Sequence, residues 1–270
     1  MDIDEFFTHL WQDYTALTPQ AERIYQAFTR KGETVVNDHV AFRTYDRAPI
    51  QLKSLEPHLL ELGYKRYAPY HFKDKKISAW GYVPPSADKP RIFMSELLTG
   101  QLSESSQKII NDLCRQVDPA RVKDIDIFWT GRPWNVPSWE DYQALLAESE
   151  YAAWLSVIGL RTNHFTISVN HLRHHRTLEE VLNTIEEENI AINTHGGKIK
   201  GQPEQLLVQA STMADKTIVS FAGGDGHEIP TCYYEFALRY KDAAGKLFQG
   251  FVPASADRIF ESTDNRSSNM

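Results

Sequence analysis

Two segments of this sequence show the same order of predicted elements. Residues 34–100 have the pattern of a strand, a helix and three further strands, and residues 159–262 repeat that order. The first strand of each segment carries a histidine, His39 in one and His164 in the other. Two β-α-β-β-β modules with a polar histidine at the same point predict a fold in which both modules contribute to one metal site.

Periodicity and turn residues indicate where these elements lie. Alternation with a period of two marks the strands, and apolar residues at helical spacing mark the helices. Thr177 is placed to cap the helix of the second segment, with two glutamates in the first turn. The predicted elements of the modules are 34–45, 50–62, 64–72, 77–83 and 91–97, then 160–169, 177–189, 206–211, 216–221 and 231–240.

We expect the whole chain, 1–270, to form one α+β domain in which the paired modules make a curved sheet around the site. A length of 270 residues is enough for a substantial core. Apolar residues at helical spacing predict N-terminal helices over 1–33, and a helical insert over 101–158 separates the modules. The polar end, 263–270, is predicted to be a flexible tail.

The composition excludes several classes of function. A net charge of -7 argues against a broad nucleic-acid surface, which needs clustered lysine and arginine. No apolar run reaches the ~20 residues of a membrane-spanning helix. Cys114 and Cys232 provide neither a disulfide framework nor a CxxC zinc site. Since the acidic start, 1–5, lacks the features of a signal peptide, we expect a cytoplasmic protein that binds no nucleic acid and no membrane.

Strand periodicity brings polar residues together on one face of three predicted strands. His39, Ala41 and Arg43 share a face, because side chains alternate along a strand. His164 lies on the polar face of its own strand, and Glu235 shares a face with residue 239 near the end of the second module. The opposite faces are apolar and are expected to pack against helices. The three polar faces predict a pocket lined by a curved sheet.

Two histidines and one carboxylate form the ligand set of non-haem Fe(II) oxygenases. Three protein ligands hold the ion from one side, while the other positions stay free for a chelating substrate and O₂. The absence of thiolate ligands argues against a structural zinc site. His39, His164 and Glu235 are therefore the candidate ligands of an Fe(II) ion, although the affinity order allows Zn or Ni to occupy such a site in the isolated protein.

Two arginines are candidates for binding a substrate carboxylate. Arg43 lies four residues beyond His39 on the same face, so their Cα atoms are roughly 13 Å apart at ~3.3 Å per residue. The guanidinium could hold one end of a short organic acid bidentately while the metal holds the other end. Arg239 has the same relation to Glu235 and is the second candidate.

The sequence contains four motifs, NDHVAFRT at 37–44, FMSEL at 93–97, TNH at 162–164 and YYEFALR at 233–239. Together they resemble the 2-oxoadipate dioxygenase/decarboxylase family, formerly a domain of unknown function, in the vicinal oxygen chelate superfamily. The resemblance implies paired βαβββ modules around a metal. It also implies an Fe(II) enzyme of lysine catabolism that converts 2-oxoadipate and O₂ to 2-hydroxyglutarate and CO₂.

By position, the resemblance implies that His39, His164 and Glu235 bind the metal and that Arg43 binds a substrate carboxylate. This chain is shorter than the best-known members of the family, which carry added segments that help to close the pocket.

Other interpretations stay open at this point. Arg43 could simply pair with Asp38 or Asp46, and Glu235 could be a surface carboxylate. Glu96 ends the fourth strand of the first module, which we interpret as the position corresponding to Glu235. As a fourth ligand, Glu96 would favour a glyoxalase- or epimerase-like lyase or isomerase that uses no O₂; otherwise it has a supporting role. A non-catalytic small-molecule-binding module of the same fold is the third possibility. The sequence makes no prediction of oligomeric state.

Overall fold

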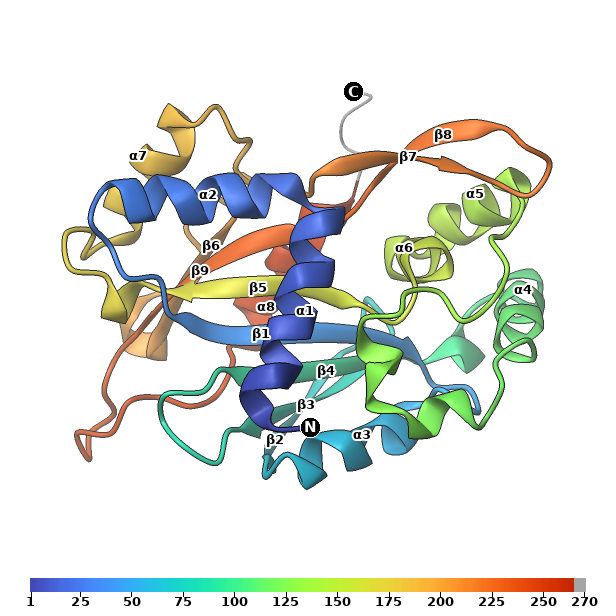
Figure 1. Cartoon of the computed structure of the whole chain (residues 1–270), viewed down its shortest axis with the longest axis horizontal. Coiled ribbons are helices and arrows are strands. Elements are labelled where there is room, and N and C mark those ends of the chain that lie inside the picture. Colours follow the sequence, from blue (N-terminus) through green and yellow to red (C-terminus); the bar gives the residue numbers. More distant parts are fainter. Residues whose placement is uncertain (265–270) are drawn as a thin grey trace.

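The computed structural model describes residues 1–264 and is built around one curled mixed sheet (Figure 1). Within these residues the sheet has seven strands, in the order β2-β3-β4-β1-β5-β9-β6. In that order the strands are β2 (Lys65–Phe72), β3 (Ile77–Val83), β4 (Arg91–Leu97), β1 (Asn37–Tyr45), β5 (Thr162–Ser168), β9 (Tyr233–Arg239) and β6 (Leu207–Ser211).

The first module forms one half of the sheet in the predicted order. Helix α3 (Leu52–Glu61) follows β1, and β4 then runs parallel to β1, with β3 and β2 added antiparallel toward the edge. The apolar face of β1 is buried, as its alternation predicts, and Phe42 packs against Phe128 of the insert. β1 begins at Asn37, slightly later than predicted.

The second module departs from the prediction at one strand. β5 is followed by α7 (Leu178–Glu187), and β9 runs parallel to β5 as β4 does to β1. The expected strand 216–221 leaves the main sheet, because β7 (Lys216–Ser220) pairs with β8 (Gly226–Pro230) in a separate hairpin (Figure 1). Residues of β7 alternate between exposed and half-buried, so no fully buried face ties them to the sheet. This module thus adds β5, β9 and β6 to the main sheet.

The central strands β1 and β5 relate the two modules by an approximate twofold axis. They run antiparallel, with His39 opposite Thr166 and Ala41 opposite His164. A twofold rotation that exchanges β1 and β5 therefore superposes the position of His39 on that of His164. The repeat seen in the sequence is a symmetry of the fold, and it brings both histidines to the middle of the sheet.

Helices α1 (Ile3–Leu17) and α2 (Pro19–Arg30), both expected near the N-terminus, lie over the face of the sheet that is toward the viewer in Figure 1. Helix α7 lies beside α2 and contacts β6 and β9. Trp11 of α1 packs edge-on against Phe165 of β5 and also contacts Tyr234 of β9. Aromatic pairs of this kind stabilise a core by about 0.5–1.5 kcal/mol beyond burial of their area. The apolar faces of β5 and β9 are thereby sealed under α1.

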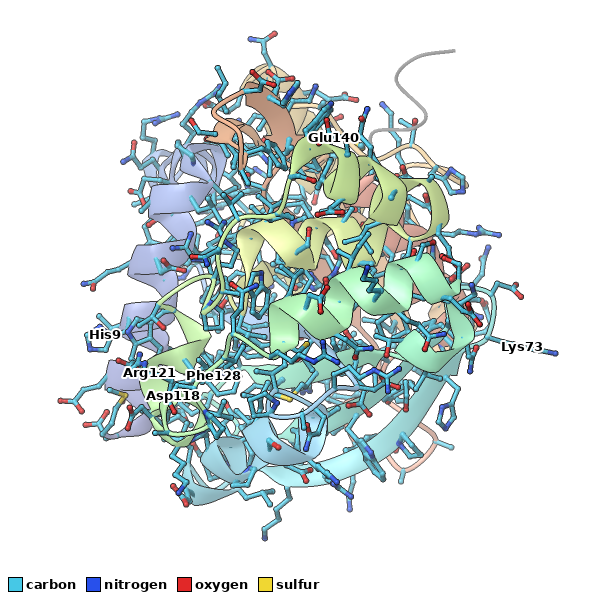
Figure 2. All side chains as sticks on the ribbon, turned by 90° about the vertical axis from the view of Figure 1, so that its right-hand side faces the viewer. His9, Lys73, Asp118, Arg121, Phe128 and Glu140 are labelled. Carbon is cyan, nitrogen blue, oxygen red and sulfur yellow. The ribbon has the colours of Figure 1, made fainter. Side chains whose placement is uncertain are left out.

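The insert packs at one end of the sheet. It contains α4 (Glu104–Cys114), α5 (Trp139–Glu148) and α6 (Glu150–Ile158). Figure 2 looks onto these helices, with Glu140 of α5 and Phe128 labelled on the same side of the molecule. The sequence did not predict α6, because all of its residues are buried and it has no exposed face to mark a helical period.

Helix α8 (Pro253–Ile259) lies behind the sheet in Figure 1 and was not predicted. It contacts both edge strands, β2 and β6, so the sheet curls until its edges flank one helix. The chain then continues to Thr263 and Asp264, which are buried. These are the first two residues of the predicted tail, 263–270, and 265–270 lie outside the described residues.

One hydrophobic cluster includes side chains from the N-terminal helices, both modules and the insert, among them Phe28, Phe42, Trp154 and Phe236. That the whole chain forms a single domain, with the segment boundaries given above, stays a prediction. Within residues 1–264, no helix is both long enough and apolar enough to span a membrane.

Candidate metal centre and substrate cavity

His39 of β1, His164 of β5 and Glu235 of β9 meet inside the curl of the sheet. The His39 Nε2 atom lies 3.4 Å from Glu235 Oε1, and the His164 Nε2 atom lies 3.2 Å from Glu235 Oε2. One ligand atom from each residue lies within 4.8 Å of the others, and all three side chains are buried. Two modules and three strands thus contribute to one cluster.

The ring of His39 is oriented by the residue before it. Asp38 Oδ1 lies 2.8 Å from His39 Nδ1, and a carboxylate oxygen accepts, so Nδ1 carries the proton and Nε2 accepts from the Thr166 hydroxyl at 3.1 Å. Arg239 donates to both oxygens of Asp38 at 2.8–3.0 Å. Although burial opposes the charge, Arg239 and His39 hold the pKa of Asp38 well below its usual range. The pairing of β1 with β5 changes register between Asn37 and His39, which is where Asp38 contacts the ring of the next residue.

His164 is oriented in the same way, but by a neutral partner. Asn163 Oδ1 lies 3.1 Å from His164 Nδ1, which leaves Nε2 free on the side of the cluster. Tyr233 stacks on the imidazole with ring centroids 4.6 Å apart. Burial, with the nearby His39 and Arg43, lowers the pKa of His164 well below its usual value. The ring is therefore neutral at physiological pH, which is the form that binds a metal.

The carboxylate of Glu235 faces both histidines. Gln209 of the neighbouring strand β6 donates to its Oε1 atom. Burial raises the pKa of Glu235 above its usual value, while His39 opposes that shift. A divalent cation held by the three residues would offset this cost of burial, because its positive charge balances the negative charge of the ionised carboxylate.

The donor set fits a divalent metal ion. At bonds of ~2.1 Å and right angles, ligand atoms lie about 3 Å apart, close to the separations between the Glu235 oxygens and the two histidine nitrogens. Both histidines direct Nε2 toward the cluster, where a metal would displace the hydrogen bond that His39 Nε2 accepts from the Thr166 hydroxyl. Cys232 is buried on the other side of β9, where its thiol donates to Thr162 O, as expected for a core thiol.

The three residues of the cluster line a cavity inside the curl of the sheet. Phe93, Phe251, Phe260 and Tyr233 supply aromatic walls. Among residues 1–264, four polar side chains on its wall each have a buried atom without a hydrogen-bond partner. These atoms are Arg43 Nε, Asn163 Nδ2, Gln209 Oε1 and Tyr233 Oη. Buried polar groups are rarely left unpaired, so a polar ligand or ordered water is needed here to satisfy these atoms.

Arg43 lies on the cavity wall, as the sequence predicts, and is almost fully buried. The alternative partners considered for it, Asp38 and Asp46, are not its partners among the ion pairs of the described residues. Its Nη1 atom lies 3.3 Å from Glu150 Oε2, and its guanidinium packs over the rings of Tyr151 and Trp154. A fixed cation therefore stands in the same cavity as the metal cluster.

Arg239, the second candidate for substrate binding, has a different position. Its Nε and Nη2 atoms bind Asp38, and Nη1 donates to Phe248 O and Gly250 O. It is not among the residues that line the cavity. Its donors are used to hold Asp38, and thereby His39, so the expectation that it contacts substrate is not supported.

Glu96 does not join the cluster. Its Oε2 atom accepts the backbone N–H of Leu52 at 2.9 Å, at the start of α3. The register between neighbouring strands explains this position. In the second module His164 pairs with Tyr233, and Glu235 lies two residues after Tyr233. In the first module His39 pairs with Arg91, and Phe93 lies two residues after Arg91. By the twofold relation Phe93, and not Glu96, corresponds to Glu235, so our interpretation of Glu96 as its counterpart is wrong.

Sequence reasoning missed several residues of the site. Asp38 was considered only as a partner of Arg43, and Glu150 and Gln209 were not considered. One signal was available, because an Asp or Asn directly precedes the histidine in both modules. No local pattern marks Glu150, which lies 107 positions from Arg43.

The comparisons with known proteins agree with this geometry. The family model described as 2-oxoadipate dioxygenase/decarboxylase matches residues 6–246. A curated relative from Oryza sativa subsp. japonica, the chloroplastic/amyloplastic 2-oxoadipate dioxygenase/decarboxylase, is 34% identical over 290 residues, which cover 97% of this chain and 80% of that protein.

Two solved structures have the same fold over nearly the whole chain. The hydroxyglutarate synthase of Oryza sativa, in complex with 2-oxoadipate, has a TM-score of 0.92 and 32% identity and covers 98% of this chain and 93% of its own. A protein described as a putative hydrolase from Shewanella frigidimarina has a TM-score of 0.89 and 43% identity, over 94% and 98% of the two chains. From the extent of the family match and the identity to the rice relative, this chain belongs to the 2-oxoadipate dioxygenase/decarboxylase family.

Proposed function

We propose that this protein is an Fe(II)-dependent, decarboxylating dioxygenase of a 2-oxo dicarboxylic acid. The proposed reaction converts 2-oxoadipate and O₂ to 2-hydroxyglutarate and CO₂. The observation that carries the proposal is the position of a buried His39–His164–Glu235 cluster and the Arg43 guanidinium in one cavity. The rice hydroxyglutarate synthase, whose structure contains 2-oxoadipate, supports the choice of substrate.

In this proposal the two ends of the substrate bind to different groups. His39, His164 and Glu235 hold the metal, which when bound supplies Lewis acidity and the means to activate O₂. The 2-oxo and C1 carboxylate groups face the cluster, and the distal carboxylate binds Arg43. Arg43 therefore fixes both the length and the direction of the substrate.

The other residues of the cavity would orient the bound acid and exclude water. Asp38 and Asn163 hold the two imidazole rings with Nε2 toward the cluster. Burial raises the pKa of the Tyr233 phenol well above its usual value, so it stays protonated and can donate a hydrogen bond into the cavity. The aromatic walls keep bulk water from the reacting atoms.

The glyoxalase- or epimerase-like alternative has less support. That alternative requires Glu96 as a fourth ligand, and the Glu96 carboxylate instead accepts a backbone N–H at the start of α3. The non-catalytic alternative would use the same polar cavity, and membership of a family of dioxygenase/decarboxylases favours an enzyme. Cytoplasmic location and a part in lysine catabolism stay predictions, as does iron over Zn or Ni.

Oxygen consumption coupled to decarboxylation tests the proposal. Protein purified without O₂ and loaded with Fe(II) should consume one O₂ for each CO₂ released when 2-oxoadipate is added, with 2-hydroxyglutarate as product. The matched control is His164→Ala, which should give neither O₂ uptake nor CO₂. If no 2-oxo acid causes oxygen uptake by the iron-loaded protein, the proposed reaction is wrong.

A further inference from the structure

Arg43, the cation on the cavity wall, forms an ion pair with a buried carboxylate. Glu150, the first residue of α6, is 5% exposed, and its Oε2 atom lies 3.3 Å from Arg43 Nη1. Thr263 joins the pair, because its hydroxyl oxygen accepts from Arg43 Nη2 at 3.1 Å and its hydrogen is donated to Glu150 Oε2 at 2.9 Å. The three side chains form one buried hydrogen-bonded group.

The Arg43–Glu150 contact is much looser than the other buried arginine–carboxylate pair at the centre of this protein. Arg239 donates to both oxygens of Asp38 at 2.8–3.0 Å. Arg43 reaches a single oxygen of Glu150, and within the described part of the chain its Nε atom has no hydrogen-bond partner. Since paired guanidinium donors are the stronger arrangement, Arg43 retains donors for a second carboxylate.

Glu150 also borders a second hollow, here called the outer hollow, whose lining includes neither Arg43 nor the metal cluster. The other charged residues of its lining are Asp74, Lys75, Lys76, Glu148 and Asp257, and each of the two lysines pairs with a glutamate other than Glu150. The outer hollow is therefore rich in carboxylates, and Arg43 is the cation that Glu150 pairs with.

We propose that Glu150 is a specificity-determining residue that competes with the distal carboxylate of the substrate for Arg43. This inference rests on the proposed function, because it assumes a substrate carboxylate at Arg43. A buried guanidinium without a counter-ion is costly, so Glu150 stabilises the empty cavity. A second carboxylate at Arg43 is repelled by the first, so Glu150 lowers the affinity for dicarboxylates and leaves monocarboxylates unaffected.

The charge of Glu150 is the decisive property. Glu150→Gln keeps the shape of the side chain and an oxygen that accepts from Thr263, but it removes the competing charge. Arg43 should stay in position, because Tyr151 and Trp154 hold its guanidinium from the sides. We therefore expect the variant to bind dicarboxylates more tightly than the wild-type protein.

The experiment compares 2-oxoadipate with 2-oxohexanoate, which has the same chain length and no distal carboxylate. Calorimetry without O₂ on the zinc-loaded protein gives the Kd of each acid independently of turnover. In Glu150→Gln the Kd of 2-oxoadipate should fall about tenfold, which corresponds to ~1.4 kcal/mol, while the Kd of 2-oxohexanoate stays unchanged. With iron, the change should be found in KM and not in kcat.

The matched control is Glu148→Gln, which removes a carboxylate from the outer hollow without touching Arg43. It should change neither Kd. Glu150→Asp, with a shorter side chain, should shift the selectivity in the same direction by a smaller factor, and it decides the matter if Glu150→Gln does not fold.

Equal selectivity of the wild-type protein and both Glu150 variants for the two acids would overturn the inference and leave the proposed reaction standing. If the wild-type protein neither binds nor turns over any 2-oxo acid, the proposed function fails, and this inference fails with it.

Discussion

At the scale of residues, the two halves of the metal cluster use the same local arrangement with different charges. His39 is oriented by an ionised Asp38, and His164 by the neutral Asn163. Asp38 is in turn held by Arg239. Of the two candidate ligands, His39 is therefore the one with a charged partner at Nδ1, and a hydrogen bond to a carboxylate makes an imidazole a better donor to a metal.

Asp38→Asn should weaken metal binding by about 10- to 100-fold, because the neutral amide orients His39 less firmly and no longer increases its basicity. Competition with a chelator measures the Kd of Zn(II) or Fe(II) on protein that circular dichroism shows to be folded. Asp126→Asn, in the distant insert, is the control and should leave the metal Kd unchanged. An unaltered Kd in Asp38→Asn would show that the aspartate has no part in the site.

Arg43→Ala should raise the KM for 2-oxoadipate by about 30-fold or more, because charge-assisted hydrogen bonds to a carboxylate contribute about 2–3 kcal/mol. Metal content, measured by elemental analysis, should stay at the wild-type level. Arg115→Ala removes an exposed arginine of the insert and should leave KM unchanged. A KM for Arg43→Ala equal to that of the wild-type protein would remove Arg43 from the substrate site.

At the scale of elements, one buried carboxylate joins the N-terminal helices to the second module. Glu33 lies between α2 and β1 and accepts the backbone N–H groups of Arg173, His174 and His175, as well as the His175 ring. Although burial opposes ionisation, these hydrogen bonds lower the pKa of Glu33 from 4.5 to about 2. Folding therefore favours the ionised carboxylate.

Glu33→Gln should lower the free energy of unfolding by about 2 kcal/mol at pH 7, because it removes charge-assisted hydrogen bonds. The folded pKa is depressed, so this stabilisation is complete above pH 4.5, declines as the pH falls and is lost below about pH 2. Urea unfolding of both proteins at pH 7 and pH 3 measures the difference, which should shrink by more than half. A difference that does not depend on pH would contradict this account of Glu33.

At the scale of the whole molecule, the cluster joins the two modules. His39 belongs to one module, and His164 and Glu235 to the other, at the approximate twofold axis. The symmetry is broken where Phe93 stands in place of a second carboxylate. One side of the ion would then be left open to ligands, which is the arrangement that oxygen activation needs.

A bound metal should therefore stabilise the entire fold. At a free metal concentration of 100 times Kd, binding contributes about 2.7 kcal/mol, which should raise Tm by several degrees. Thermal unfolding with and without Zn(II) measures the shift, which EDTA should reverse. His164→Ala should show almost no shift, and His195→Ala, an exposed histidine, should behave as the wild-type protein. Equal shifts in all three proteins would mean that the ion binds elsewhere.

Local and periodic features of the fold could be predicted from the amino-acid sequence. The alternation of β1 and β9 brought His39, Arg43 and Glu235 to the polar faces of their strands, and the repeated motif paired His39 with His164. These features could be predicted because the side of a strand on which a residue lies depends only on its neighbours along the chain.

Tertiary structure decided which distant segments meet. It brought Glu150 to Arg43 and used Arg239 to hold Asp38, across 107 and 201 positions of sequence. In the tertiary structure β7 also pairs with β8 outside the main sheet, and Phe93, not Glu96, has the position equivalent to that of Glu235. Periodicity could not predict these contacts, because they depend on strand register and on the curl that brings both sheet edges to α8.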